Sequence, residues 1–511
     1  MTVVQSQFLG LTGFISQNAA WYPEKIAVIC EGKRLTWGEF NKRINRNACR
    51  LRQMGVEKGS TVAILSGNCL EYPEIMFGAL KAGAIIAPIS TMLQPDTVRL
   101  QLQDAMPKAI FANRGTVHLA GADPSPKIRI VVGGDSEGWT PYKDFFEGAS
   151  EEEPATQVEP EDVYNIVYSS GTTGIPKGIV HSHQARVLFA MTCGLEFRVH
   201  NEAVSLITTP LYANGTQLIF LPTILVGGTL VLMRSFDARD FLALVEQERI
   251  THTFLVPTQF IRIMEHAEFS RFDTASVQVL LSAAAPLRKD TKNEILRKFP
   301  NSKLAELYGI TEGISTVLRP DEQFTKPGSV GKPRLGGDIK IIDSAGRELR
   351  RGEIGEIVGT NVSMMSQFYR NPSATKEVIW QDQRGREYIK TGDIGKLDEE
   401  GYLYILDRKK DVIISGGINI FPSDVEEVLM LHPEVSEAAV IGIPHREWGE
   451  SPYALVVKRD PRSDLLEADI RNWANERLAS YQRLAGVEFV SSLPRNDLGK
   501  VLKSELRRRC F

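Results

Sequence analysis

Short apolar runs alternate along the chain with segments in which apolar residues recur every three or four positions. The first such pair is Ile26–Cys30, an unbroken apolar run, and Trp37–Met54, whose apolar residues have helical spacing. This pair predicts a strand followed by a helix. The same pattern predicts strands at Thr61–Leu65, Ala84–Ile89, Ala109–Ala112, Ile128–Val132, Gly228–Met233 and Thr253–Val256, and helices at Tyr72–Ala82, Ala238–Glu248 and up to Met264. This alternation indicates an α/β fold with a mainly parallel sheet covered by helices.

The pattern changes in the last third of the chain. Residues from about 339 to 406 form short alternating runs with Gly and Asp turns, which predict a small β-rich subdomain. Beyond it we expect a compact α+β domain, with helices at Pro422–Met430 and Glu467–Ala479 and strands at Glu437–Ile443 and Ala454–Lys458. Because 511 residues exceed the size of a single hydrophobic core, we predict a large domain over 1–406 and a small domain over 407–511, joined at the charged turn that begins with Asp407.

Composition and charge narrow the class of protein. The net charge of -3 provides no positive field for a polyanion, so we expect no nucleic-acid partner. The five cysteines are widely spaced and show no CxxC pattern, which predicts free thiols and favours the cytoplasm. No window approaches about 18 uninterrupted apolar residues, and no basic segment precedes the first apolar stretch. We expect a soluble protein without an integral membrane segment; a homodimer stays open.

A glycine-rich loop between two apolar runs carries the strongest chemical signal. It spans 168–178 and contains Ser169, Ser170, Gly171, Thr172, Thr173, Gly174 and Lys177. The glycines let several backbone N–H groups point at one anion, while the hydroxyls and the lysine add donors and positive charge. The spacing is not that of a Walker loop, and no dinucleotide-binding motif is present. The loop predicts a phosphate site, against the alternative of a flexible surface loop.

Loop 168–178 closely resembles the signature loop of the adenylate-forming superfamily, which includes acyl-CoA synthetases, luciferases and peptide-synthetase adenylation domains. Further matches follow in the same order along the chain: Leu80–Ala84 with Pro88, Tyr308–Glu312, Lys390–Asp393, Asp407-Arg408 with Ser415–Gly417, and Pro494–Lys500. The resemblance is to the acyl-CoA ligase branch. It implies a large domain of stacked α/β subdomains and a small mobile C-terminal domain that rotates about Asp407.

The resemblance implies an ATP-dependent carboxylic acid:CoA ligase. The acid is first converted to an acyl-adenylate, because a bare carboxylate would have to expel oxide; the acyl group then passes to coenzyme A with release of AMP. ATP, Mg²⁺ and coenzyme A as co-substrate are therefore expected. Two alternatives stay open: an acyl-AMP ligase that loads a separate carrier protein, and a non-catalytic nucleotide-binding module.

The same resemblance assigns residues to the adenylation step. Lys500 is expected to bridge the acyl carboxylate and the α-phosphate, and Glu312 to hold Mg²⁺. Thr172 and Lys177 would contact phosphate. The expected nucleotide-binding residues are Ser169, Ser170, Gly171, Thr173, Gly174, Ala283, Ala284, Ala285, Tyr308, Gly309, Thr311, Asp393 and Arg408. A solvated lysine, a core tyrosine and a turn aspartate are the plainer interpretations of Lys500, Tyr308 and Asp393.

Gly416, Gly417 and Trp448 are expected to line the path of coenzyme A, where a side chain at the glycines would obstruct the thiol. For Trp448, packing within the small domain is an equally open interpretation. His181 and His183 follow the phosphate loop, but no acidic or Cys partner stands at metal-ligand spacing, so packing or capping is favoured for them.

The predicted acyl pocket contains Tyr212, Ala213, Asn214 and Gly215. Ala213 stands where CoA ligases commonly carry His, and the segment lacks the Asp that pairs with an α-ammonium in amino-acid-activating domains. No Arg or Lys stands in the segments expected to form the pocket. We therefore expect a monocarboxylic acid with an aliphatic, alicyclic or aromatic body.

Overall fold

The computed structural model describes residues 8–121, 126–169, 177–285, 287–496 and 499–510. The chain forms two compact units. The first contains 1–327, 333–338 and 360–378, and the second contains 328–332, 339–359 and 379–511. Because the second unit includes the β-rich segment as well as the C-terminal segment, the predicted division at Asp407 stays a prediction.

One sheet of the first unit has the strand order β15-β14-β13-β12-β10-β11-β1-β2. The ladders between β14 and β1 are parallel, and β15 and β2 pair antiparallel. The inner strands β1, β11 and β13 are nearly continuous apolar runs, as burial on both faces requires. The bounds are β1 Ile26–Cys30, β2 Lys33–Thr36, β10 Val204–Ile207, β11 Thr229–Leu232, β12 His252–Leu255, β13 Val279–Ala283, β14 Lys303–Gly309 and β15 Ser315–Leu318. Helices α8 (Ala238–Gln247), α9 (Pro257–Met264) and α10 (Lys289–Lys298) supply its covering core.

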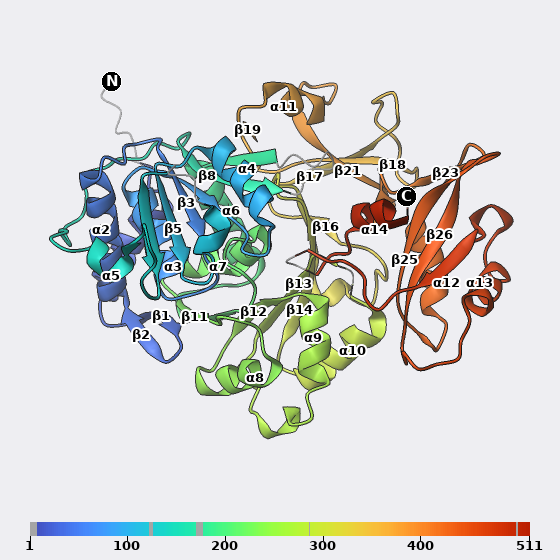
Figure 1. Cartoon of the computed structure of the whole chain (residues 1–511), viewed down its shortest axis with the longest axis horizontal. Helices are drawn as coiled ribbons and strands as arrows, with labels where there is room; N and C mark the ends of the chain where they lie inside the picture. The colour runs from blue at the N-terminus through green and yellow to red at the C-terminus, as the bar shows by residue number, and fades with distance from the viewer. Residues whose placement is uncertain (1–7, 122–125, 170–176, 286, 497–498, 511) are drawn as a thin grey trace. The chain divides into compact units, whose positions relative to one another are not determined.

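The other sheet of this unit has the order β19-β9-β8-β4-β3-β5-β6-β7 and is parallel from β8 to β7. Helix α3 (Glu71–Lys81) packs on β3 and β4 of this sheet, and helix α2 (Trp37–Gln53) packs on α3 (Figure 1). The Thr36 hydroxyl and the Glu39 carboxylate form a capping box that begins α2. The bounds are β3 Thr61–Leu65, β4 Ile85–Pro88, β5 Ala109–Asn113, β6 Ile128–Val132, β7 Thr140–Pro141, β8 Val163–Ser169, β9 Lys177–Ser182 and β19 Gln367–Phe368. The predicted α/β fold class is confirmed.

The second unit contains two smaller sheets, ordered β17-β18-β21-β20 with β22 beside β21, and β24-β23-β26-β25 with β27 beside β26. The bounds are β17 Asp338–Ile342, β18 Gly355–Thr360, β20 Ile379–Gln381, β21 Glu387–Leu397, β22 Leu403–Arg408, β23 Ile413–Ser415, β24 Ile418–Ile420, β25 Val435–His445, β26 Gly449–Lys458 and β27 Gly486–Phe489. Helices α12 (Pro422–Met430), α13 (Glu467–Asn475) and α14 (Lys503–Cys510) pack on the second of them.

One predicted helix is shorter than the periodicity suggested. Helix α13 ends at Asn475 rather than at Ala479. The Asn475 side chain accepts a hydrogen bond from the backbone N–H of Leu484 (2.7 Å) and donates one to its carbonyl (3.2 Å). These bonds turn the chain back, and Leu478 reaches the core from a turn rather than from helix.

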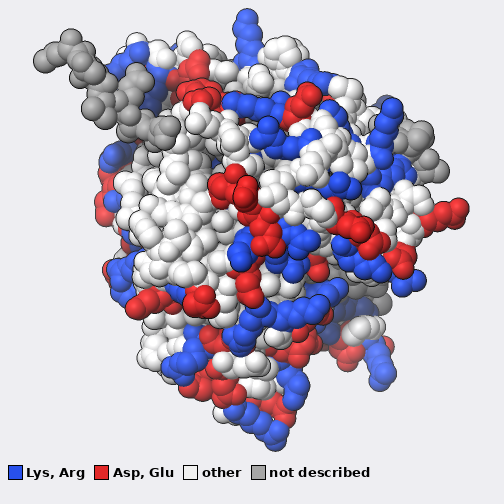
Figure 2. Space-filling model, turned by 90° about the vertical axis from the view of Figure 1, so that its left-hand side faces the viewer, with Lys and Arg blue, Asp and Glu red and all other residues white. Residues whose placement is uncertain are grey.

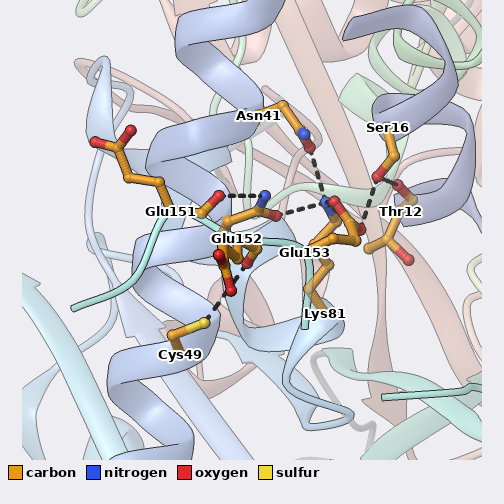
Figure 3. Close-up of polar contacts among 9 residues, drawn as sticks. Thr12, Ser16, Asn41, Cys49, Lys81, Glu151, Glu152 and Glu153 are labelled. Carbon is orange, nitrogen blue, oxygen red and sulfur yellow. Dashed lines mark hydrogen bonds and ion pairs between the residues drawn. The ribbon is translucent and has the colours of Figure 1, made fainter. Parts of the chain in front are cut away.

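Lys81, the lysine of the Leu80–Ala84 motif, organises a buried polar cluster in the first unit (Figure 3). Its ammonium donates to the side-chain oxygens of Asn41 and Asn45, each at 2.7 Å, and pairs with the Glu153 carboxylate at 2.7 Å. The Ser16 hydroxyl also donates to Glu153, at 2.8 Å. The lysine thus ties the acidic segment 151–153 to three helices.

Among the residues that the structure describes, no helix has both the length and the apolar character needed to cross a membrane. Cys30, Cys49, Cys69 and Cys193 are free thiols. On the face drawn in Figure 2, basic and acidic side chains are interspersed around an extended uncharged area.

Candidate active site

The predicted phosphate loop joins the antiparallel strands β8 and β9. Ser169 ends β8 and is paired with Lys177, which begins β9. The predicted residues Ser170, Gly171, Thr172, Thr173 and Gly174 lie outside the described residues. The strands close tightly below the loop, because a Cβ at Gly178 would lie 2.8 Å from the Ile166 side chain. The Lys177 ammonium lies 5.4 Å from the centroid of the Phe368 ring.

Two predicted nucleotide-binding segments meet at one edge of the sheet. Ala283 ends β13 and pairs with Leu307 of the adjacent parallel strand β14. Ala284 and Tyr308 therefore lie next to each other at the carboxyl ends of neighbouring strands, where α/β sheets bind ligands. Ala284 has a φ of +75°, a strained conformation for a residue with a side chain.

Glu312, the predicted Mg²⁺ ligand, lies on the turn that follows β14. Its backbone carbonyl accepts from the N–H of Met365 at 2.9 Å. The next residue, Gly313, has a φ of +108°, and a Cβ there would lie 2.7 Å from the backbone of Met364. Only glycine fits this approach, so the turn holds Glu312 in a fixed backbone position. A carboxylate on a fixed turn is a suitable donor for a hard cation.

His181 connects the phosphate-loop hairpin to this turn. Its Nε2 donates to the Thr311 carbonyl at 2.9 Å, which leaves Nδ1 as the acceptor for the Arg186 guanidinium at 3.1 Å. Burial, followed by the nearby Arg186 cation, lowers the pKa of His181 well below its usual value, so the ring is neutral. Its role is to position Thr311.

His183 begins helix α6 (His183–Glu196) and is also buried. Its ring packs edge-on against Tyr164 at a centroid distance of 5.2 Å. Burial is the main cause that lowers the pKa of His183 to about 4. The packing interpretation of both histidines agrees with these contacts.

The predicted acyl-pocket segment 212–215 leads into helix α7 (Gln217–Val226). Asn68 anchors its start, because the Asn68 side chain donates to the carbonyls of Thr209 and Met233, both at 3.0 Å, and accepts from the N–H of Leu211 at 2.8 Å. Tyr212 is buried at the wall of a small cavity of about 10 Å³, which has room for about one water molecule. Asn214 also lines this cavity. Ala213 and Gly215 are not among its lining residues.

Arg186 of α6 lines the same cavity and was missed by sequence reasoning. It is 2% exposed, and its guanidinium donates to the Asn214 side chain at 2.9 Å. The expectation of a monocarboxylic acid stays a prediction. A sequence signal that could have indicated Arg186 is its position shortly after loop 168–178, in the first turn of α6.

In the second unit, Asp393 and Arg408 face each other across strands β21 and β22. The Arg408 Nε lies 3.3 Å from the Asp393 carboxylate, and Asp393 is 4% exposed. Asp407, the predicted hinge, accepts hydrogen bonds from the N–H of Arg408 (2.7 Å) and from that of Ser423 in α12 (3.0 Å). Its carboxylate thus connects the end of β22 to the start of α12.

Lys500 lies in a turn in which its backbone exchanges two hydrogen bonds with Asn496, both at 2.9 Å. The residue is exposed to solvent on one side, while neighbouring protein atoms partly desolvate its ammonium. This partial burial, followed by the Arg408 cation, lowers the pKa of Lys500 to about 8, while Asp393 acts in the opposite direction. Within this unit the structure therefore brings the predicted Lys500, Asp393 and Arg408 into one electrostatic group.

Gly416 and Gly417 follow β23 with φ values of +58° and +82°. The predicted Trp448 lies directly against Gly416, since a Cβ at Gly416 would be 2.9 Å from its ring. No heavy atom lies within 4 Å of a Cβ placed at Gly417. The Trp448 side chain is 51% exposed, which leaves its ring accessible to a ligand.

The chain is similar to known proteins over most of its length. Residues 15–369 match the AMP-binding enzyme family, and residues 424–500 match the AMP-binding enzyme C-terminal domain. The chain belongs to the AMP-binding enzyme family.

Two curated relatives and one solved structure illustrate the similarity. A feruloyl-CoA synthase from Amycolatopsis sp is 33% identical and covers 98% of this chain and 99% of its own. The fatty acid–[acyl-carrier-protein] ligase ScoC of Streptomyces coeruleorubidus is 31% identical over 97% of this chain and 95% of its own. The o-succinylbenzoate CoA synthetase MenE of Bacillus subtilis, solved with its acyl-adenylate intermediate, is 28% identical, with a TM-score of 0.84 and coverage of 97% of each chain.

Proposed function

We infer that this chain is an AMP-forming acid–thiol ligase, which activates a carboxylic acid as an acyl-adenylate and transfers the acyl group to coenzyme A. The observation that carries the inference is the match of both family models in order along the chain, together with MenE, a similar enzyme caught with its acyl-adenylate. AMP is a useful activating group because it replaces oxide as the leaving group.

The residues of the first unit suit the nucleotide half of this chemistry. The carboxyl ends of β13 and β14 place Ala284 beside Tyr308, whose flat ring is suited to stack on adenine. Glu312 would hold Mg²⁺, which supplies charge neutralisation at the phosphates. His181 fixes the carbonyl of Thr311 and with it the turn that carries Glu312.

The residues of the second unit suit the remaining steps. Asp393 would accept the ribose hydroxyls, and the ammonium of Lys500 would offset the repulsion between the acyl carboxylate and the α-phosphate. Gly416 and Trp448 would guide the thiol of coenzyme A. Rotation of a mobile C-terminal domain about Asp407 would separate the two half-reactions.

The substrate is a carboxylic acid; that it is a monocarboxylic acid stays a prediction. A cytoplasmic location and a homodimer stay predictions.

A carrier protein is the second candidate acceptor, because the carrier-protein ligase ScoC is nearly as similar to this chain (31% identical) as the feruloyl-CoA synthase is (33%). Thioester formation with coenzyme A in one reaction and with a phosphopantetheinylated carrier in another separates the two. A non-catalytic nucleotide-binding module would give neither product.

The decisive experiment is a panel of carboxylic acids with ATP and Mg²⁺, with acid-dependent pyrophosphate release as the first measurement. The expected result is release with at least one acid and formation of its CoA thioester when coenzyme A is added. Absence of pyrophosphate with every acid, from protein shown to be folded, would overturn the inference.

A further inference from the structure

Arg495 contacts the backbone directly beside Lys500. Its Nη1 donates to the carbonyl of Gly499 at 2.5 Å, and its Nη2 pairs with the Glu437 carboxylate at 2.7 Å. Glu437 belongs to β25, which pairs with β26 along its length. Arg495 therefore connects the peptide bond that precedes Lys500 to a strand of the folded sheet.

The peptide bond between Gly499 and Lys500 is held on both of its edges. Arg495 donates to its carbonyl, and its N–H donates to Oδ1 of Asn496 at 2.9 Å. Gly499 has a φ of +77°, a conformation that glycine adopts without steric cost. Because a peptide group is planar, bonds on opposite edges fix its orientation. They thereby fix the Cα of Lys500 and the direction in which its side chain leaves the backbone.

The chain on both sides of these bonds is anchored in the core of the second unit. Leu493 is 5% exposed, and Val501 packs against the same apolar cluster. The N–H of Leu502 donates to the carbonyl of Pro494 at 2.8 Å, which joins the two arms. Packing therefore fixes the arms, while side-chain hydrogen bonds hold the peptide of Lys500 between them.

The exposure of the Arg495–Glu437 pair separates a structural role from a role in the reaction. The two side chains are 31% and 41% exposed. Ion pairs with this exposure contribute little to the stability of a fold. In contrast, displacement of a reacting group by about 1 Å can lower a rate by about 100-fold. The larger effect of Arg495 is therefore expected on the rate of the reaction that uses Lys500.

We propose that Arg495 is a positioning residue for the adenylation step. It fixes the position from which the Lys500 side chain extends toward the acyl carboxylate and the α-phosphate. The proposal rests on the proposed function, which assigns adenylation to Lys500. The planar guanidinium bonds to a carbonyl and to a carboxylate at once, in fixed directions. A lysine at this position would keep the charge but lose that geometry.

The first test is Arg495→Met in the full chain, with the two half-reactions measured separately. The rate constant of acid-dependent pyrophosphate release should fall by about 10–100-fold, because Lys500 is no longer held in place. Thioester formation from supplied acyl-AMP should be largely spared. Arg495→Lys should recover part of the first half-reaction. Glu437→Gln, which removes the negative partner of Arg495, should show a smaller loss in the same half-reaction.

A second test combines Arg495→Met with Lys500→Ala. Residues that act as a unit have non-additive effects on a rate. Single-turnover adenylation by the double variant should therefore equal that of Lys500→Ala alone. A merely structural role of Arg495 would lower the rate by the same factor in both backgrounds, and that result would overturn the proposal.

Arg459→Met is the matched control within the second unit. Arg459 also bonds to the backbone, because it donates to the carbonyls of Pro433 (2.8 Å) and Val435 (3.2 Å), but it holds no part of 499–500. This variant should leave both half-reactions unchanged. Thermal unfolding midpoints of the Arg459 and Arg495 variants should be similar, which shows that lost stability does not cause the lost rate.

Two further results would count against Arg495. Unchanged pyrophosphate release in Arg495→Met would reduce its contacts to a surface ion pair, and equal losses in both half-reactions would assign it to the fold. If Arg495→Met does not fold, the same comparisons are made with Arg495→Lys and Glu437→Gln. Failure of the proposed function gives a different result, because the unchanged protein would then release no pyrophosphate with any acid; that outcome overturns this proposal as well.

Discussion

The backbone N–H of Gly416 donates to the carbonyl of Trp448 at 2.8 Å, and a Cβ at Gly416 would lie 2.9 Å from the indole ring. Gly417, the next residue, has open space around the same position. The two glycines share a left-handed conformation and differ in their surroundings. Substitution of each glycine in turn therefore distinguishes the cost of backbone strain, which both share, from the steric effect of a side chain on the Trp448 ring, which only Gly416 would show.

Gly416→Ala should displace the Trp448 ring and reduce transfer of the acyl group to coenzyme A by about tenfold or more, while adenylation is retained. Gly417→Ala, the matched control, carries only the cost of a left-handed residue, about 1 kcal/mol. Single-turnover thioester formation from supplied acyl-AMP measures the effect. Equal losses in the two variants would show that contact with Trp448 has no part in the transfer step.

Lys500→Ala should reduce adenylate formation by about 10²–10³-fold, the usual cost of removing a charge positioned for the transition state. Thioester formation from supplied acyl-AMP should be largely spared. Pyrophosphate release and thioester formation are measured separately. Equal loss in both half-reactions would contradict the assignment of Lys500 to the first.

The adenylation rate should also fall as the pH rises through about 8, because the pKa of Lys500 is lowered to about 8 by burial and by Arg408, and the ammonium is lost above that pH. In Lys500→Arg the guanidinium stays charged, so any remaining activity should not show this fall. A pH–rate profile of the first half-reaction tests this. An unchanged fall in the Arg variant would assign it to another group.

Lys81→Met should lower the thermal unfolding midpoint by several degrees, equivalent to about 3 kcal/mol, because it leaves Glu153 and two asparagine side chains without the cation that joins them. Scanning calorimetry measures the shift. The control is Lys42→Met, whose exposed pair with Glu151 at 3.9 Å should contribute at most about 1 kcal/mol. Similar midpoints for the two variants would contradict the structural role of Lys81.

Glu74 should make the stability of the first unit depend on pH. Burial raises its pKa to about 7, although the Arg43 guanidinium at 2.6 Å acts in the opposite direction. Between about 4.3, its unfolded value, and 7, the folded state binds more protons, so this contribution to stability is lost as pH rises. The thermal midpoint should therefore decline less from pH 5 to 8 in Glu74→Gln than in the unchanged protein. Equal declines of the thermal midpoint in the two proteins would contradict the assignment of this pH dependence to Glu74.

Much of the fold could be read from the chain because the strands of parallel sheets are buried on both faces. Ile26–Cys30 and Thr61–Leu65 are mostly apolar for this reason, and their predicted bounds are those of the structure. The end of α13 could not be predicted, because the bonds from Asn475 to Leu484 form only after the chain turns back.

The residues of the candidate site also fall into those that the sequence predicts and those that it does not. Tyr308, Glu312 and Lys500 are recognisable because their motifs are continuous in sequence. Asn68 and Arg186 are not, since each acts on segments more than twenty residues away and has no local pattern.

The sequence by itself determined the fold class, the order of the motifs and the residues expected at the nucleotide, because periodicity and motif spacing are local properties of the chain. Only the tertiary structure decided that the Arg186 guanidinium is buried beside Asn214, that His181 fixes Thr311, and that Lys500 shares an electrostatic group with Asp393 and Arg408. Those relationships depend on burial and on distances between residues far apart in the chain, which exist only once the sheets have formed.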